Sequence, residues 1–424
     1  MGRTAAKAGT HLSGLRHVSA VEAVTERELP RTPDFGVWPQ THRIEKAAID
    51  SDTVRIQWND GRLSRYHFRW LRDGCACDQC VHPSSREQLF DIAALGAEVA
   101  PLTVEVDAAG ALNVVWNDDH HHSRYHPGWL RAWDYSNPPK ASSDPITPVT
   151  WDASFADKIP SFDGPAVLQD DDALYQWLRA LQQFGLTRLT QVPCEPDAVE
   201  RVAARVGAIR ESNFGRTFDV RSIVNSESSA YTAAALPPHT DLPTREVQPG
   251  IQMLHCLENS VSGGESVMVD GFLLAEVLRR KDPDAFLRLT TTPLEFASRS
   301  PRFEYRYRAP MIAVDAAGRV CELRPGALVR APVVADFDQM EAIYDAIQCF
   351  FRLAADPKLR AVFPIRVGDL LAMDNRRVLH ARTAFDAESG ERHLKGCYMD
   401  RDELLSRLRV LERKRPRRGN IHIS

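Results

Sequence analysis

The chain has 424 residues, of which 43% are hydrophobic and 26% are charged, and its formal net charge at pH 7 is −4. This composition is typical of a globular protein, and the length predicts two domains. The slightly acidic balance argues against nucleic acid as a partner, and no apolar run approaches the roughly 20 residues needed to cross a bilayer.

The first 35 residues predict a flexible arm. They mix basic residues with Glu22, Glu26 and Glu28 and lack the apolar segment of a signal peptide. Eight cysteines in a chain of this length do not indicate a disulfide scaffold. We therefore expect a cytoplasmic protein.

An internal repeat follows the arm. The run from Trp58-Asn-Asp to Trp70-Leu-Arg recurs between Trp116-Asn-Asp and Trp129-Leu-Arg. In each copy a short strand with alternating polarity, 54–58 or 112–116, enters a polar turn, and a second strand follows. Two such hairpins predict a small β domain over residues 36–135.

Three cysteines lie close together within this domain. Cys75, Cys77 and Cys80 fall within six residues, so their thiolates can reach one ion. Zn²⁺ held tetrahedrally is the natural partner, and thiolate-rich closed sites of this kind are structural. The other five cysteines are scattered and predict buried free thiols.

The zinc site requires a fourth ligand. His82 stands only two residues beyond the last cysteine, too near to close the tetrahedron without strain. The second hairpin carries three consecutive histidines, of which we favour His121. One residue is inserted here relative to the first repeat, so His120 stays open as the alternative.

Residues 136–150, rich in Pro and Ser, predict a linker to a second domain over 151–412, and a basic tail covers 413–424. Expected helices cover 171–184, 196–206, 272–280 and 336–353, and expected strands cover 186–192, 251–257, 265–269, 367–373 and 394–399. Gly185 suits the end of the first helix, and Asp270 suits the start of the third. The fold predicted is mainly β with peripheral helices, a double-stranded β-helix (jelly roll) behind a small zinc-binding β domain.

A potential metal triad lies in the second domain. His239 and Asp241 are two residues apart, so a strand would direct both side chains to one side, and His380 can join them from a distant strand. Two imidazoles and one carboxylate on one face of Fe(II) leave positions open for a co-substrate and O2. Arg392, twelve residues after His380, can grip a carboxylate. These residues predict an Fe(II) oxygenase that consumes a 2-oxo acid.

Together these motifs resemble the gamma-butyrobetaine dioxygenase and trimethyllysine dioxygenase branch of the Fe(II)/2-oxoglutarate oxygenases. The resemblance runs from about residue 53 to residue 411. The motifs that carry it are Trp70-Leu-Arg-Asp-x-Cys-x-Cys-x-x-Cys, Tyr231-Thr, Pro238-His-Thr-Asp, Leu254-His-Cys, Gly263-Gly-Glu-Ser, Asp374-Asn-x-Arg-x-Leu-His-x-Arg and Arg392-His-Leu-x-Gly-x-Tyr.

The resemblance implies roles for the co-substrate residues. Fe(II) would be bound by the triad, and Arg392 would hold the distal carboxylate of 2-oxoglutarate. Leu254, Ser266 and Arg382 would line the co-substrate pocket. The N-terminal domain would bind zinc and contribute to a homodimer.

In this branch the substrate's trimethylammonium group sits in an aromatic cage. The matching positions here are Phe214, Phe218, Tyr231 and Tyr398. Phenylalanine attracts a cation less strongly than tryptophan, so the resemblance implies a looser cage or another cation.

Three further positions depart from the branch pattern. Leu242 stands where an aromatic residue is expected, and Ser228 stands where an amide is expected. Arg324 falls near the position of an Asn that would contact the substrate carboxylate, and an arginine there could bind a carboxylate, sulfonate or phosphonate.

Three functions therefore stay open. The first is hydroxylation of a small betaine-like zwitterion such as gamma-butyrobetaine. The second is the same chemistry on an amino acid or a natural-product intermediate. The third is a non-catalytic metal-binding scaffold, which the complete iron and co-substrate residue set disfavours.

Overall fold

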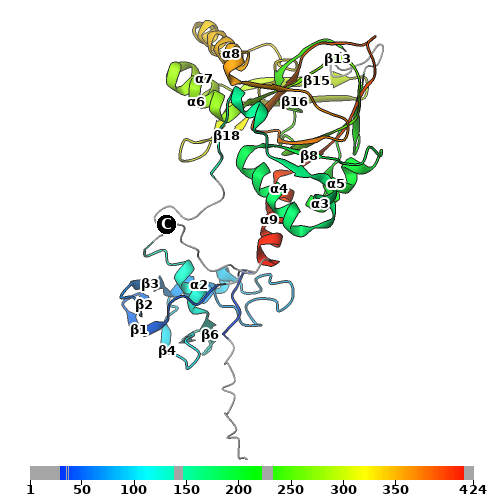
Figure 1. Ribbon diagram of the computed structural model, residues 1–424. Coiled ribbons are helices and arrows are strands. Elements are labelled where there is room, and N and C mark those ends of the chain that lie inside the picture. The colour runs from blue at the N-terminus through cyan, green and yellow to red at the C-terminus, as the bar shows by residue number, and fades with distance from the viewer. Residues whose placement is uncertain (1–28, 35, 37, 138–146, 222–232, 415–424) are drawn as a thin grey trace, which may run out of the picture. The chain divides into compact units, whose positions relative to one another are not determined.

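The computed structural model describes residues 29–34, 36, 38–137, 147–221 and 233–414. The chain divides into two compact units, Met1–Ser143 and Asp144–Ser424, each described by itself (Figure 1). The predicted arm, linker and basic tail fall largely outside the described residues, so these boundaries stay predictions. In the described part of the chain, every helix is too short or too polar to pass through a bilayer.

The first unit contains two three-stranded antiparallel sheets, with strand orders β1-β2-β3 and β4-β5-β6. Its elements are β1 (Ile44–Asp50), β2 (Thr53–Trp58), β3 (Leu63–His67), α1 (Phe68–Asp73), a 3-10 turn (Ile92–Ala94), β4 (Pro101–Val106), β5 (Leu112–Trp116), β6 (His122–Tyr125) and α2 (Pro127–Ala132). The repeat is therefore three strands and a helix, larger than the predicted hairpin. The added strands β1 and β4 are largely exposed. Their sequences therefore lack the alternation of apolar and polar residues from which a strand is predicted.

The two repeats interlock through equivalent buried hydrogen bonds. Within each repeat a tryptophan Nε1–H donates to a serine hydroxyl, from Trp58 to Ser64 at 2.8 Å and from Trp116 to Ser123 at 2.9 Å. Between repeats, the hydroxyl of Tyr66 donates to the carbonyl of Leu130 in α2, and that of Tyr125 donates to the carbonyl of Leu71 in α1, both at 2.6 Å. Buried Trp and Tyr need such partners, so the aromatic core also fixes how the repeats meet.

The second unit contains two principal sheets. The larger sheet has the order β10-β23-β12-β20-β8-β7, with β9 also paired to β23, and the smaller sheet has the order β11-β21-β14-β19. Their strands are β7 (Ser161–Asp163), β8 (Leu186–Thr190), β9 (Ile209–Arg210), β10 (Phe218–Arg221), β11 (Leu236–His239), β12 (Ile251–Asn259), β14 (Ser266–Asp270), β19 (Arg360–Phe363), β20 (Leu370–Asp374), β21 (Val378–Arg382) and β23 (Arg392–Met399). All strand pairs in these sheets are antiparallel except β7 with β8.

Three two-stranded antiparallel sheets complete the strands of this unit. They are β13 (Ser262–Gly263) with β22 (Phe385–Asp386), β15 (Leu294–Ser300) with β16 (Phe303–Ala309), and β17 (Ile312–Val314) with β18 (Val320–Leu323).

Helices form two apolar clusters around the sheets (Figure 1). One cluster packs α3 (Gly164–Gln169), α4 (Asp171–Phe184), α5 (Ala198–Val206) and α9 (Arg401–Lys414) against the larger sheet. The other cluster gathers α6 (Gly271–Lys281), α7 (Pro283–Thr291) and α8 (Met340–Ala354) beside the smaller sheet. Short 3-10 turns cover Ala153–Asp157, Phe337–Gln339 and Pro357–Leu359.

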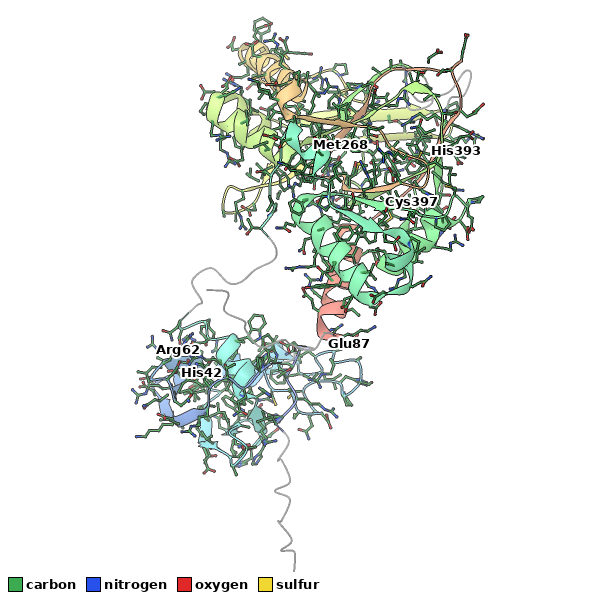
Figure 2. All side chains as sticks on the ribbon, in the orientation of Figure 1. His42, Arg62, Glu87, Met268, His393 and Cys397 are labelled. Carbon is green, nitrogen blue, oxygen red and sulfur yellow. The ribbon has the colours of Figure 1, made fainter. Side chains whose placement is uncertain are left out.

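Strand alternation separates these outer clusters from a third core between the sheets. On β14 of the smaller sheet, Met268 joins the core that includes Leu254 and Leu394 of the larger sheet, whereas Cys397 on β23 joins the helical layer (Met268 and Cys397 are labelled in Figure 2). Because every second residue of a strand shares a face, the even-numbered residues of β12, β14, β21 and β23 meet in one interior. That interior holds the functional side chains described below.

The structure confirms a mainly β protein with peripheral helices. Helix α4 covers 171–184 as predicted, ending at Gly185 with a φ of 71°, and the side chain of Asp270 accepts the backbone N–H of Phe272 at the start of α6. The expected strand 186–192 ends earlier, at Thr190, and the expected helix 336–353 begins later, at Met340. Helices α7 and α9 and the β15–β16 hairpin were not predicted.

Candidate active site

His239, Asp241 and His380 lie together in the second unit. His239 ends β11 and is the register partner of His380 on β21, and their ring centroids are 4.3 Å apart. The Nε2 atoms of His239 and His380 lie 3.5 and 3.6 Å from Oδ1 of Asp241. The three ligand atoms are within 4.8 Å of one another, so one ion can be bound from a single side.

The second carboxylate oxygen of Asp241 is held by the larger sheet. Its Oδ2 accepts hydrogen bonds from Gln252 Nε2 at 2.8 Å and from the hydroxyl of Tyr398 at 2.7 Å. Gln252 on β12 and Tyr398 on β23 are register partners, which explains why both reach the same oxygen. Oδ1 is thereby left facing the two imidazoles.

The backbone of Asp241 is also fixed, by a fully buried asparagine. Asn375 Oδ1 accepts the N–H of Asp241 at 2.7 Å, and Asn375 Nδ2 donates to the carbonyl of Asp241 at 3.0 Å and to that of Pro249 at 3.2 Å. Neither Asn375 nor Gln252 was singled out as a site residue. Asn375 lies inside the Asp374-Asn motif, and Gln252 shares the inward face of β12 with Leu254, so each carried a usable signal.

The electrostatics of the triad suit metal binding. Burial lowers the pKa of His380 to about 4, assisted by His239, so its imidazole is neutral near pH 7. Burial opposes ionisation of Asp241, but His380, His239 and the Tyr398 hydroxyl outweigh it and hold the pKa of that carboxyl well below its usual range. The Nδ1 of His239 lies 2.8 Å from the carbonyl of Pro237, which leaves Nε2 available as a ligand. Burial opposes protonation of His239, but Asp241 outweighs it and raises the pKa of that imidazole. A divalent ion would displace this proton, because neutral imidazoles and an ionised carboxylate are the forms that bind it.

An inner cavity of about 130 Å³ opens from the triad between the two sheets. Leu254, Ser266, Arg382 and Arg392 line it, as predicted for a co-substrate pocket. Arg392 is buried, and among the described residues its Nε has no hydrogen-bond partner. Burial lowers the pKa of Arg392. An arginine with an unmet donor in a cavity can pair with a carboxylate.

An outer cavity of about 620 Å³ adjoins two of the three triad residues. Five residues line both cavities, namely Phe214, Leu236, His239, Asp241 and Tyr398, whereas His380 lines only the inner one.

Leu242, directly after the metal-site aspartate, lines the outer cavity with a φ of 53°. Such a backbone conformation is strained for a leucine and is typical of functional sites.

The predicted cage aromatics partly assemble next to the triad. Phe218 stacks on Tyr398 with ring centroids 4.8 Å apart, and Phe214, which is 40% exposed, lies 6.5 Å from Phe218. Gly396 is the register partner of Phe218, and a Cβ there would lie 2.6 Å from the ring. Tyr231 and Ser228 lie outside the described residues, so their predicted roles stay predictions.

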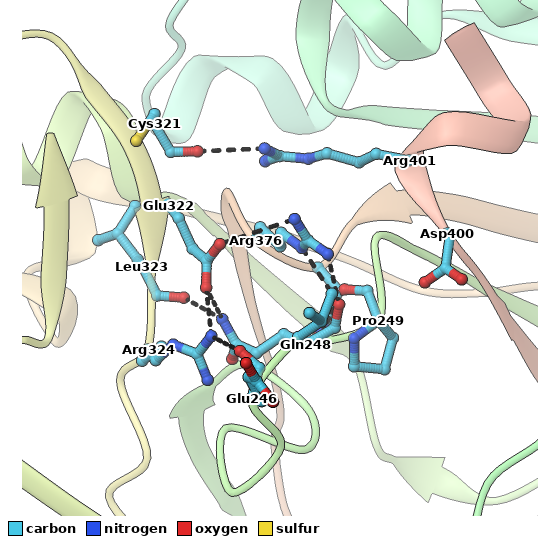
Figure 3. Close-up of polar contacts among 12 residues, drawn as sticks. Glu246, Gln248, Pro249, Cys321, Glu322, Leu323, Arg324, Arg376, Asp400 and Arg401 are labelled. Atoms are coloured by element: carbon cyan, nitrogen blue, oxygen red, sulfur yellow. Dashed lines mark hydrogen bonds and ion pairs between the residues drawn. The ribbon is translucent and has the colours of Figure 1, made fainter. Parts of the chain in front are cut away.

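The structure places Arg324, predicted as a substrate ligand, among polar contacts within the protein (Figure 3). Arg324 is buried and lines neither the inner nor the outer cavity. Its guanidinium donates to the carbonyls of Pro243, Arg245 and Glu246 at 3.1, 2.6 and 2.7 Å and pairs with Glu322 at 2.8 Å. With these donors engaged, Arg324 instead holds the loop that follows Leu242.

A buried glutamine ties the same loop to the triad. Gln248 Nε2 donates to Glu322 Oε1 at 3.0 Å and to the carbonyl of Leu323 at 2.9 Å (Figure 3). Its Oε1 accepts the hydroxyl of Thr240, the residue between His239 and Asp241, at 3.1 Å. The loop and the metal ligands therefore share one polar network.

In the first unit, Cys75, Cys77, Cys80 and His121 form a second group with metal-ligand spacing. The three Sγ atoms lie 3.3, 3.6 and 3.6 Å from His121 Nε2. Hydrogen bonding to Cys75 and, against burial, the Arg72 guanidinium lower the pKa of Cys80 to about 5. Three thiol sulfurs and one imidazole fit a tetrahedral zinc ion. His120, the alternative, is not in the group.

Comparison with known proteins identifies the family. A model described as taurine catabolism dioxygenase TauD, TfdA family matches residues 142–398, and one described as gamma-butyrobetaine hydroxylase-like, N-terminal, matches residues 46–131. The gamma-butyrobetaine dioxygenase of Pseudomonas sp. (strain AK-1) is 46% identical over 380 residues, which cover 90% of this chain and 99% of that protein. The human gamma-butyrobetaine dioxygenase is 30% identical over 388 residues, which cover 89% and 99%.

Among solved structures, the PvcB protein of Pseudomonas aeruginosa covers 53% of this chain and 79% of its own, at 20% identity and a TM-score of 0.41. That likeness is too weak to support any statement about function. The family models and the two dioxygenases carry the identification instead, and they confirm the prediction of an enzyme with Fe(II) and 2-oxoglutarate as cofactor and co-substrate. The chain belongs to the gamma-butyrobetaine dioxygenase family of Fe(II)- and 2-oxoglutarate-dependent oxygenases.

Proposed function

We propose that this dioxygenase hydroxylates an unactivated C–H bond of a small betaine-like zwitterion, gamma-butyrobetaine or a relative with another anionic group. The observation that carries the proposal is that His239 and Asp241 line two cavities, the inner one with Arg392 for a carboxylate, and that the aromatic residues Phe214 and Tyr398 line both. The 46% identity to a gamma-butyrobetaine dioxygenase supports the substrate class.

In this proposal His239, Asp241 and His380 bind Fe(II). When bound, Fe(II) with 2-oxoglutarate and O2 supplies oxidation of a C–H bond, with succinate and CO2 as co-products. Gln252 and Tyr398 keep Oδ1 of the aspartate directed at the ion.

The inner cavity takes 2-oxoglutarate in this proposal. Arg392 pairs with its distal carboxylate, while Leu254 and Ser266 shape the pocket walls and Arg382 contributes a second positive charge. Arg382 is positioned by donating to the carbonyl of Ala234 at 2.7 Å. The narrow, largely apolar space excludes water around the charged pair, which strengthens it.

The substrate's cationic end is assigned to the aromatic group Phe214, Phe218 and Tyr398, of which Phe214 and Tyr398 line both cavities and Phe218 lines the inner one. A quaternary ammonium over these rings gains cation–π attraction of about 0.5–2 kcal/mol, less on phenylalanine than on tryptophan.

Four further assignments belong to this proposal. The two principal sheets form the double-stranded β-helix, and Cys75, Cys77, Cys80 and His121 hold a structural zinc ion. The protein works as a homodimer through its N-terminal domain. A reducing cytoplasm would keep its eight free cysteines as thiols.

One observation favours the second candidate, the same chemistry on a different small molecule. The outer cavity of about 620 Å³ is of a size that accommodates drug-sized ligands, which are larger than gamma-butyrobetaine. A non-catalytic scaffold has no such support, since the family models that match the chain are those of enzymes.

The test supplies purified protein with Fe(II), 2-oxoglutarate, O2 and gamma-butyrobetaine and measures succinate and product mass. We expect succinate release that the betaine stimulates, with a product 16 mass units heavier, as one inserted oxygen requires. His380→Ala should abolish both signals, and Arg306→Gln, outside the lining of both cavities, should keep them. Succinate without any betaine product would favour the second candidate, and no Fe(II)-dependent succinate at all would refute the proposal.

A further inference from the structure

We infer that Arg299 and Arg302, at the turn between β15 and β16, form the anion subsite of the outer cavity. The inference rests on the proposed function, because it assigns the end of the zwitterion that the aromatic residues cannot hold. The ligand chemistry is an oxyanion, either a carboxylate or a sulfonate or phosphonate, joined by a short chain to a quaternary ammonium.

The residues that line the outer cavity fall into two groups of different charge. Beside His239 and Asp241 the cavity is lined by Phe214 and Tyr398, whose rings favour a cation. On the β15–β16 turn it is lined by Ser298, Arg299, Ser300, Arg302 and Phe303. Asp241, Arg299 and Arg302 are the only Asp, Glu, Lys or Arg residues among the described residues lining this cavity, so its far wall is cationic.

Both guanidiniums are available to a ligand. Among the described residues, no ion pair or side-chain hydrogen bond engages Arg299 or Arg302, and both are exposed. Neighbouring arginines are engaged: Arg306 pairs with Glu295 and Glu304, and Arg245 stacks on Tyr305 and donates to Asn213. Arg299 and Arg302 therefore differ from these neighbouring arginines, because their guanidiniums have no partner among the described residues.

A glycine also lines this cavity. A Cβ at Gly326 would lie 2.7 Å from the ring of Phe296 and 3.0 Å from Pro243, so a larger residue would force the neighbouring lining to move. Gly326 itself lines the cavity, whereas the nearby Arg324 is committed to backbone carbonyls of the loop. The positive charge facing the ligand thus comes from the β15–β16 turn.

Two guanidinium forks offer more donors than one carboxylate can accept. Arginine binds planar and tetrahedral oxyanions through paired N–H donors, and a second fork adds charge for a dianion. We therefore expect the affinity order phosphonate, then sulfonate or carboxylate, then an uncharged amide, for ligands with the same trimethylammonium chain.

The experiment measures binding, so that it does not depend on turnover. Isothermal calorimetry is carried out without O2 on holoenzyme loaded with Mn(II) and 2-oxoglutarate. The ligands are 4-(trimethylammonio)butyrate, its sulfonate and phosphonate counterparts, and its amide. The variants are Arg299→Gln, Arg302→Gln and the double variant. Arg306→Gln, an arginine of the same hairpin outside the cavity lining, is the matched control.

We expect the double variant to weaken every anionic ligand about ten- to a hundredfold, the effect of losing charge-assisted hydrogen bonds, and to leave the amide within about twofold. The 2-oxoglutarate affinity should stay unchanged, which also shows that the variant is folded. Equal loss in Arg306→Gln, equal loss for the amide, or no loss for the anions would each overturn the inference.

Failure of the inference can be told apart from failure of the proposed function. If the anions bind the double variant normally while Fe(II)-dependent succinate formation persists, only the subsite is wrong. If the wild type binds the amide as tightly as the three anions, the cavity has no anion subsite. Absence of succinate formation under every condition would instead refute the function itself.

Discussion

At the residue scale, the activity depends on one carboxylate whose two oxygens have different surroundings. Oδ1 of Asp241 faces two imidazoles, whereas Oδ2 is held by Gln252 and Tyr398. Groups that orient a metal ligand in this way commonly contribute ten- to a hundredfold to metal affinity. The sheet register that pairs Gln252 with Tyr398 is therefore part of the metal site.

Gln252→Met should weaken binding of Mn(II) or Fe(II) about ten- to a hundredfold, because Oδ2 loses one of its two donors and the carboxylate can rotate. Tyr398→Phe should have an effect in the same direction, while keeping the ring against Phe218. Metal titration monitored by calorimetry measures both. Gln57→Met, in the first unit, is the control, and unchanged affinity in both site variants would show that these donors do not orient the ligand.

At the element scale, the two repeats of the first unit depend on each other. Each tyrosine hydroxyl reaches the helix of the other repeat, so neither repeat satisfies its own helix carbonyl.

The insertion that made the zinc register ambiguous also has an explanation at this scale. Asp119 and His120 both adopt positive φ, 46° and 53°, which turns the chain so that His121 meets the cysteines.

Tyr66→Phe and Tyr125→Phe should destabilise the first unit by similar amounts, about 1–3 kcal/mol each, because each leaves a buried carbonyl without its donor. Urea denaturation followed by tryptophan fluorescence gives the free energy of unfolding. Tyr135→Phe, whose hydroxyl is bonded at the exposed His67, should cost under about 0.5 kcal/mol. A large difference between the two buried variants would contradict the equivalence of the repeats.

Zinc removal should unfold the first unit, because this small domain has a limited core and its three thiol sulfurs lie within 4.8 Å of one another. Elemental measurement should find about one zinc ion per chain in the wild type and much less in Cys77→Ser. Cys349→Ser, a lone cysteine on α8, should keep the zinc. His120→Ala should also keep it, whereas His121→Ala should not, and the opposite result would restore the alternative ligand.

Elements were predictable where the determinants are local. Helix α4 has a capping aspartate at Asp170 and a glycine in the left-handed conformation at Gly185, and both its ends agree with the prediction. The contacts of Arg324 could not be predicted, because its partners are backbone carbonyls about 80 residues away in sequence, which carry no residue-type signal. The β15–β16 hairpin did show a signal, since Tyr305 and Tyr307 alternate with charged residues.

At the scale of the whole molecule, one buried ion pair in the second unit connects segments that are far apart in the sequence. Arg377, before the strand that carries His380, pairs with Asp270 at 2.8 Å, and both side chains are almost fully buried. Arg377 also donates to the carbonyls of Val149 and Gln183. The pair thus fixes the entry of the chain into this unit, the end of α4 and the start of α6 around one guanidinium.

Arg377→Met should destabilise the second unit by about 3–5 kcal/mol, because Asp270 would keep a buried charge without its partner and the carbonyls of Val149 and Gln183 would lose a donor. The double variant Arg377→Met with Asp270→Asn should cost less than the sum of the single variants, since asparagine removes that charge and can still accept the N–H of Phe272. Urea denaturation of the full chain with Fe(II) and 2-oxoglutarate absent measures these free energies. Arg319→Met, which breaks an exposed pair with Asp315, should change the free energy of unfolding by under about 0.5 kcal/mol. Strict additivity of the two buried substitutions would mean that Arg377 acts through its carbonyl contacts rather than through the charge pair.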